Sequence, residues 1–182
     1  MTVATTNSTA ALEAISAPRD PSAARAVKGA LYTPDERRRR DASKWTIVQG
    51  ILAPIQFLVM AISVCLVLRY LSTGTGLPIA NASVVVKTLV LYTIMVTGAI
   101  WEKEVFGQYL FAAPFFWEDV VSFFVIALHT VYLAGLVQGW PPRTLMVLAL
   151  VAYATYAVNA VQFILKLRAA RLADRVTNIS AP

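Results

Sequence analysis

The amino-acid sequence predicts an all-α integral membrane protein, a bundle of four transmembrane helices. Of its 182 residues, 58% are hydrophobic and 14% are charged, an apolar excess that soluble domains do not show. Four apolar runs are each long enough to cross a hydrocarbon core of about 30 Å as a helix. We expect spans at about residues 46–68, 84–100, 120–137 and 145–165.

The distribution of positive charge predicts the orientation of these helices. Four consecutive arginines at residues 37–40 precede the first apolar run, and four more basic residues lie within 166–175. The connection at 72–83 contains no lysine or arginine. Because short basic segments tend to stay cytoplasmic, we expect both termini and the middle connection at 101–119 on the cytoplasmic side. The net charge of +6 therefore reflects membrane topology and does not indicate a nucleic-acid partner.

We divide the chain into three segments. Residues 1–30 are rich in Ala, Ser and Thr without a sustained apolar period, so we expect a disordered tail. Residues 31–175 form the membrane domain, and residues 176–182 form a short C-terminal tail. A capping box formed by Thr33 and Glu36 predicts that a helix begins just before the arginine block.

The spans contain few side chains with reactive or ionisable groups. Cys65 is the sole cysteine, which excludes an internal disulfide and a CxxC metal motif. The sole histidine, His129, excludes bis-histidine haem ligation within one chain. Lys87 lies about one turn inside the second span. Its ammonium either reaches back to the membrane interface or pairs with an inward-facing acid or amide.

The segment between the second and third spans concentrates the ionisable groups. Its charged side chains are Glu102, Lys103, Glu104, Glu118 and Asp119. Neighbouring carboxyl groups near a low-dielectric boundary repel one another, so one of them is a candidate proton donor near neutral pH. A structural interpretation of Glu118 and Asp119 is equally open, because carboxylates are favoured at the N-terminus of a helix.

A polar stripe follows one face of the third span. Glu118, Ser122, Val125, His129 and Tyr132 are spaced by four, three, four and three residues, which places them on one side of a helix. His129 lies about 16 Å deeper than Glu118 along the axis. It is therefore a candidate for an interhelical hydrogen bond, for a proton relay, or for axial ligation of the metal in a tetrapyrrole.

The tryptophans stand at the ends of the spans. They are Trp45, Trp101, Trp117 and Trp140. The simplest interpretation is the aromatic belt that membrane proteins place at the lipid–water interface. Trp101 and Trp117 flank the acidic residues, so stacking on a flat ligand is the alternative for these two.

Several long motifs resemble a known family. The segments are LYTPDERRRRDASKWTIVQGILAPIQF at 31–57, WEKEVFGQYLFA at 101–112, FFWEDV at 115–120 and QFILKLRAARL at 162–172. They resemble the 3-vinyl bacteriochlorophyllide hydratase family, and the resemblance extends from residue 31 to about residue 172. It implies a lyase of bacteriochlorophyll biosynthesis that adds water across the C3 vinyl group of a chlorophyllide-type macrocycle and forms a 3-(1-hydroxyethyl) group.

The resemblance also implies the chemical context of the protein. No cofactor is needed, because water addition is redox-neutral and the substrate carries its own magnesium; no intrinsic metal is expected. The partners are the tetrapyrrole substrate and membrane lipid, and a homo-oligomer and neighbouring pigment-biosynthesis enzymes are further candidates. We expect the inner membrane of a phototrophic bacterium, either cytoplasmic or intracytoplasmic, with the active site near the cytoplasmic face.

We assign hypothetical roles to the polar residues on this basis. Glu118 and Asp119 are the first candidates for the acid that protonates the vinyl group and the base that guides water, with Glu102 and Glu104 in reserve. His129 is a candidate ligand of the substrate's magnesium. However, its separation of about 16 Å from Glu118 exceeds the reach from the metal to the vinyl group. One alternative is a water or another group at magnesium, with His129 structural or acting in a proton relay. The other is a vinyl acid located elsewhere, for example on the loop at 101–116 folded inward.

The remaining candidates contact the macrocycle itself. The residues expected to cover its flat face or to share the polar stripe with His129 are Trp101, Phe111, Phe115, Phe116, Trp117, Ser122 and Tyr132. Two other functions remain open. A non-catalytic pigment carrier would share this pocket, whereas a small transporter would be expected to show internal repeats and acids midway through the membrane.

Overall fold

The computed structural model describes residues 31–179, with side chains described through residue 172. The described chain is all-helical. Its helices are α3 (Pro34–Ala42), α4 (Lys44–Thr73), α5 (Leu77–Phe106), α6 (Phe116–Val137) and α7 (Pro142–Ile179). Helices α4 to α7 are long and apolar enough to cross a membrane, so the predicted fold class is confirmed. The tail predicted at 1–30 and the last residues, 180–182, lie outside the described residues.

The helices are longer than the predicted spans. Helix α5 continues beyond residue 100 to Phe106, and α6 begins at Phe116 rather than at residue 120. The predicted connection at 101–119 is therefore reduced to a loop of residues 107–115. The sequence becomes polar before α5 ends, so hydropathy alone places the end of the helix too early. The helix ends at Gly107, whose φ of 85° is the left-handed conformation that favours glycine.

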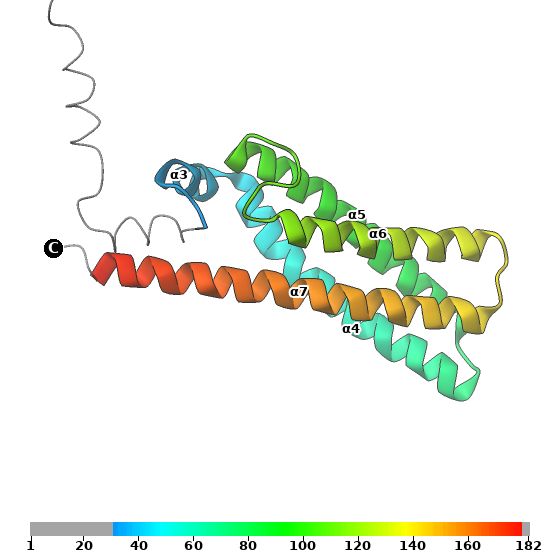
Figure 1. The fold of residues 1–182 in the computed structure, drawn as a ribbon. Helices are drawn as coiled ribbons and strands as arrows, with labels where there is room; N and C mark the ends of the chain where they lie inside the picture. Colours follow the sequence, from blue (N-terminus) through cyan, green and yellow to red (C-terminus); the bar gives the residue numbers. More distant parts are fainter. Residues whose placement is uncertain (1–30, 180–182) are drawn as a thin grey trace, which may run out of the picture.

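The four long helices form two antiparallel hairpins. Helix α4 packs along α5, and α6 packs along α7, whereas the contacts between the hairpins are fewer. Figure 1 shows α6 and α7 running side by side, with α4 and α5 behind them. We call the surface where the two hairpins meet the seam. Polar side chains cross it, because Ser63 on α4 bonds to Tyr153 on α7 and Lys87 on α5 lies against Tyr156 on α7.

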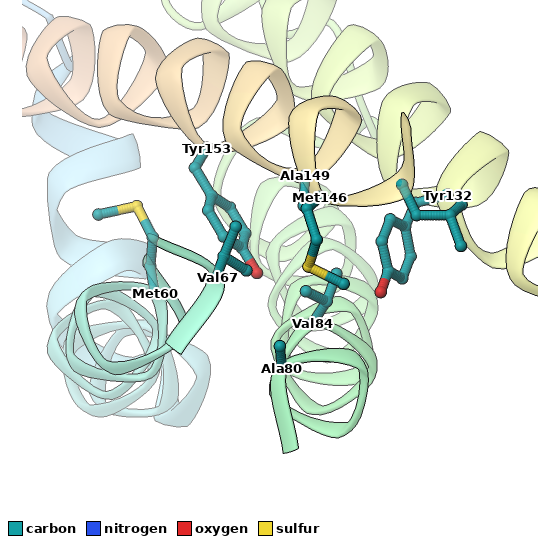
Figure 2. Packing of buried hydrophobic residues seen from close by; sticks show 9 residues of the cluster. Met60, Val67, Ala80, Val84, Tyr132, Met146, Ala149 and Tyr153 are labelled. Atoms are coloured by element: carbon teal, nitrogen blue, oxygen red, sulfur yellow. The ribbon is translucent and has the colours of Figure 1, made fainter. Parts of the chain in front are cut away.

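A hydrophobic cluster closes one end of the seam (Figure 2). Its residues are Met60, Val67, Ala80, Val84, Tyr132, Leu145, Met146, Ala149 and Tyr153. Two hydrogen bonds reinforce it, from Tyr132 Oη to Asn81 Oδ1 at 2.8 Å and between Ser63 Oγ and Tyr153 Oη at 2.6 Å. This end contains the connections at 74–76 and 138–141, so the acidic loop lies at the opposite end of the bundle.

Helix α3 lies at the end that carries the acidic loop. Its predicted capping box is present, with Thr33 N donating to Glu36 Oε2 at 2.7 Å and Glu36 N donating to Thr33 Oγ1 at 3.3 Å. Arg39 Nε donates to the Val105 carbonyl at 2.8 Å. This contact ties the arginine-rich helix to the last turn of α5, immediately before the loop at 107–115.

Candidate active site

The loop at 107–115 brings the ends of α5 and α6 together. Phe111 lies near its centre and has a φ of 59°, a left-handed conformation that costs a residue with a side chain about 1 kcal/mol or more. Backbone strain of this kind is concentrated at functional sites. Here it directs the consecutive N–H groups of Phe111 and Ala112 at two carboxyl groups.

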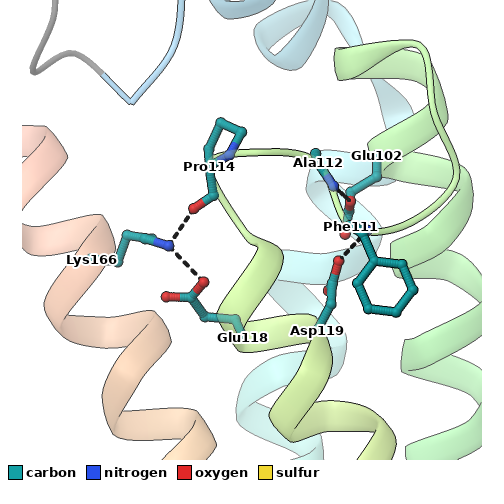
Figure 3. Close-up of polar contacts among 7 residues, drawn as sticks. All are labelled: Glu102, Phe111, Ala112, Pro114, Glu118, Asp119 and Lys166. Carbon is teal, nitrogen blue, oxygen red and sulfur yellow. Dashed lines mark hydrogen bonds and ion pairs between the residues drawn. The ribbon is translucent and has the colours of Figure 1, made fainter.

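These carboxyl groups belong to Glu102 and Asp119, which form what we call the carboxyl pair. Their side chains lie within range of electrostatic interaction with each other, and both residues are about 5% exposed or less. Phe111 N donates to Asp119 Oδ2 at 2.6 Å, and Ala112 N donates to Glu102 Oε2 at 3.2 Å. Figure 3 shows the two side chains reaching the loop from neighbouring helices. Two neighbouring carboxylates repel one another in a buried site, which favours a proton on one of them, so the pair is suited to hold an acid beside a base.

Glu118 has a different partner, although it precedes Asp119 in the sequence. Its Oε2 atom lies 2.6 Å from Lys166 Nζ, and Lys166 also donates to the carbonyl of Pro114 in the loop. Adjacent residues of a helix point about 100° apart, which is why Glu118 faces α7 while Asp119 faces α5 (Figure 3). The ion pair neutralises Glu118 and attaches the loop to α7.

Glu104 lies apart from the other carboxylates. Its Oε2 atom accepts a hydrogen bond of 2.6 Å from Ser43 Oγ, and Ser43 caps the N-terminus of α4. The side chain of Glu104 is exposed. The structure therefore brings together Asp119 and Glu102, one residue from each pair that the sequence suggested, and separates both from Glu118 and Glu104.

The aromatic candidates separate into a buried group and an exposed group. Trp101 and Phe115 pack against each other with ring centroids 5.7 Å apart, and Trp101 Nε1 donates to Thr46 Oγ1 at 2.9 Å. Phe115 is 2% exposed. With Tyr32, Phe106 and Phe163, these rings form an aromatic cluster, in which Phe115 is buried and Trp101 is partly exposed.

The exposed group borders the carboxyl pair on the outside of the bundle. Phe111, Phe116 and Trp117 are joined there by Phe123, a residue that the sequence did not single out; we call these four residues the aromatic surface. Phe123 stacks on Phe111 with centroids 5.4 Å apart. The exposed fractions of the four range from 40% for Phe111 to 69% for Trp117. The seven-residue spacing of Phe116 and Phe123 in the sequence indicates that these two rings share one face of the helix.

The polar stripe of α6 faces inward as predicted. Asn159 Nδ2 donates to Ser122 Oγ at 2.7 Å. His129 is fully buried, with Nδ1 2.8 Å from the carbonyl oxygen of Val125. Tyr132 belongs to the hydrophobic cluster. The Lys87 side chain is also fully buried, with Nζ 3.9 Å from the centroid of the Tyr156 ring, so it does not reach back to the interface.

Comparisons with known proteins agree with the resemblance. A family model described as 2-vinyl bacteriochlorophyllide hydratase (BCHF) matches residues 32–169. A protein of that name from Cereibacter sphaeroides is 67% identical over 142 residues, covering 78% of this chain and 89% of the relative. Another from Rhodobacter capsulatus is 61% identical over 155 residues, covering 85% and 88%. No solved structure matches significantly. The chain belongs to the 2-vinyl bacteriochlorophyllide hydratase family.

Proposed function

We propose that this chain hydrates the vinyl group of a chlorophyllide-type tetrapyrrole and so forms the 1-hydroxyethyl group of a bacteriochlorophyll precursor. It would act as a hydro-lyase in the membrane of a phototrophic bacterium. The observation that carries the site assignment is the convergence of Glu102 and Asp119 on the consecutive N–H groups of Phe111 and Ala112. A reaction that consumes one proton at one carbon and releases one from water needs an acid and a base side by side.

The ends of the helices favour one distribution of the shared proton. Asp119 lies in the first turn of α6, where the positive end of the helix dipole stabilises a carboxylate and Phe111 donates a short hydrogen bond. Glu102 lies near the C-terminus of α5, where the dipole disfavours negative charge. Glu102 therefore holds the proton and Asp119 is the base.

The reaction then balances within the carboxyl pair. Glu102 transfers its proton to the terminal vinyl carbon; a C–H bond forms as the π bond breaks, and positive charge develops on the carbon attached to the macrocycle. Water attacks this carbon, forms the C–O bond and gives its proton to Asp119. Transfer of that proton back to Glu102 restores the starting state. Because water addition leaves the oxidation level unchanged, the reaction calls for no redox cofactor.

The aromatic surface is the side from which the substrate would arrive. A tetrapyrrole dissolves in the bilayer, and Phe111 both belongs to this surface and donates its N–H group to Asp119. Aromatic rings stack on flat macrocycles, so these residues would guide the vinyl edge toward the carboxyl pair. The excess of arginine and lysine at the same end of the bundle supports a cytoplasmic position for the site.

The test compares variants of the carboxylates. Glu102→Gln and Asp119→Asn keep the shape of each side chain but remove the acid–base function, and Glu104→Gln is the matched control outside the pair. The vinyl-bearing tetrapyrrole is added to membranes that contain each variant, and the hydrated product is quantified by mass spectrometry. We expect the pair variants to lose about 10²–10⁴-fold in rate while the control retains the parent rate.

Two outcomes would contradict the proposal. Parent-like rates in both pair variants would remove the carboxyl pair from the mechanism. A parent protein that binds the macrocycle but yields no product would favour the non-catalytic pigment carrier. In that case Glu102→Gln and Asp119→Asn would also leave binding unchanged.

A further inference from the structure

His129 has the bonding arrangement of a metal-ligating imidazole. The carbonyl oxygen of Val125 can only accept a hydrogen bond, so Nδ1 carries the proton. Nε2 therefore presents a lone pair, and it is buried without a hydrogen-bond partner among the described residues. Histidines that bind metals donate their other ring N–H to a backbone carbonyl or carboxylate in this way. A buried acceptor without a donor is otherwise costly.

The surroundings of this imidazole disfavour a positive charge on it. The ring is fully buried and the Lys87 side chain is its basic neighbour. Tyr153 lies beside the ring, with centroids 5.8 Å apart, and the Tyr156 ring lies beside Lys87. No carboxylate of the described residues bonds to either His129 or Lys87.

Other polar atoms along the seam also lack partners. Gln56 Oε1 on α4, Lys87 Nζ on α5, and Asn159 Oδ1 and Gln162 Oε1 on α7 are buried with no hydrogen bond from described groups. Together with His129 on α6, every long helix contributes one such residue or more. Unsatisfied polar atoms are few in folded proteins, so five of them on four packed helices favour a ligand with polar groups.

We infer that His129 Nε2 is the axial ligand of the central magnesium of a tetrapyrrole bound in the seam, with the Lys87 ammonium paired to a carboxylate of the same molecule. The inference rests on the proposed function for the identity of the macrocycle. A magnesium tetrapyrrole needs an axial donor, and a chlorophyllide has a free carboxylic acid because it lacks the esterifying alcohol. The seam offers one group suited to each.

The position of His129 relates this site to the carboxyl pair. His129 lies ten residues after Asp119 on α6, about 15 Å along the axis. Its ring points back toward the N-terminus of α6, as the contact with Val125 shows. That separation exceeds the reach from the central metal to the vinyl group, so a macrocycle held by His129 occupies a site apart from the carboxyl pair.

The test is whether binding depends on the metal and on His129 together. The full-length protein in detergent is titrated with magnesium chlorophyllide and with the same macrocycle lacking magnesium, and binding is followed by absorption. We expect His129→Ala to weaken binding of the magnesium form by at least about tenfold and to leave binding of the metal-free form nearly unchanged. Thr130→Ala, on the exposed side of the same turn, is the matched control.

Rescue separates ligation from packing. Added imidazole should restore the affinity of His129→Ala for the magnesium form and shift its absorption toward that of the parent. A variant that fails to fold would lose both forms alike, so His129→Leu, which preserves much of the bulk and has no ligand atom, is measured beside it. Equal loss of both forms in the folded His129→Leu variant, or unchanged binding of the magnesium form in either variant, would overturn the inference.

The two proposals fail in different ways. Metal-dependent binding through His129 without any hydrated product in the parent would remove the hydratase proposal and leave the metal site intact. Hydration that depends on Glu102 and Asp119, with no preference of the parent for the magnesium form, would leave the hydratase proposal intact and remove the metal site.

Discussion

The Nζ atom of Lys166 on α7 lies 2.6 Å from Oε2 of Glu118 on α6 and also donates to the Pro114 carbonyl. One ammonium thus joins two helices and the loop at 107–115. The side chain of Glu118 is 7% exposed, and that of Lys166 is 28% exposed, so this ion pair is better shielded from water than a surface pair. It holds the loop whose N–H groups bind the carboxyl pair.

Breaking this ion pair should impair both stability and activity. We expect Lys166→Met to lower the free energy of unfolding by about 3 kcal/mol, because it leaves the carboxylate of Glu118 buried without a counter-charge. Hydration should fall because the loop at 107–115 is released. Thermal unfolding and product formation measure the two effects.

Charge reversal distinguishes the ion pair from simple packing. The double variant Glu118→Lys with Lys166→Glu should recover part of the stability that each single variant loses, and Lys166→Arg should stay close to the parent. If the double variant is no more stable than the worse single variant, the pairing of the charges is not what holds the loop.

The strain at Phe111 predicts an order among substitutions. Phe111→Ala and Phe111→Gly both remove the ring that stacks on Phe123, but only glycine adopts a φ of 59° without a steric penalty. We therefore expect the glycine variant to be more stable than the alanine variant by about 1 kcal/mol. Thermal unfolding of the two variants gives the difference directly. Equal stabilities would mean that the loop relaxes when the ring is absent.

Close packing at the turn between α6 and α7 predicts a second stability difference. A Cβ atom at Gly135 would lie 2.8 Å from the ring of Trp140 and 3.0 Å from Leu145, distances that require displacement of a bulky side chain. We expect Gly135→Ala to destabilise the protein by about 1–3 kcal/mol, as overpacking generally does. The measurement is thermal unfolding in detergent.

Gly98 supplies the matched control for Gly135. A Cβ atom at Gly98 would meet only the Gln49 side chain, at 3.7 Å, which is an ordinary contact. Gly98→Ala should therefore be neutral, or stabilising by up to about 1 kcal/mol because alanine favours helix. Destabilisation of both variants to the same extent would indicate a general intolerance of the helices and not a clash at Trp140.

The four spans could be predicted from sequence, but the pairing of the carboxylates could not. Apolar runs predict the helices because each transmembrane helix needs enough consecutive apolar residues to cross the hydrocarbon core. Glu118 and Asp119 were grouped because they are adjacent, yet the rotation of a helix turns them toward different neighbours. Glu102 was placed in a connection, because hydropathy falls there before α5 ends.

The direction of the Lys87 side chain is a second feature that the sequence did not determine, because it depends on how the helix is rotated about its axis. A lysine one turn into a span can reach the interface or point inward, and both are compatible with the sequence. The choice depends on helix rotation and on what α7 presents, here the ring of Tyr156 at 3.9 Å. By contrast, the motifs at 101–112 and 115–120 predicted the family correctly, because they are long and chemically unusual.

Lys87 should therefore contribute to ligand selection at the expense of stability. Burying an ammonium without a carboxylate partner costs free energy, so we expect Lys87→Met, which has a similar length and no charge, to raise the free energy of unfolding by about 1 kcal/mol or more. We expect the parent to bind the free-acid macrocycle about tenfold more tightly than its methyl ester, because the acid makes one charge-assisted contact with Lys87. Lys87→Met should bind the two forms equally.

Titration of the parent and Lys87→Met with both forms of the macrocycle checks the prediction. The methyl ester retains the ring, the metal and nearly the same size but cannot be charged, so its binding reports every contact except the one assigned to Lys87. The expected pattern is weaker binding of the free acid with unchanged binding of the ester. If both forms weaken equally, Lys87 supports the shape of the seam and does not pair with the carboxylate. The distinction matters because a buried lysine without a counter-charge is costly, and a ligand carboxylate would supply that counter-charge.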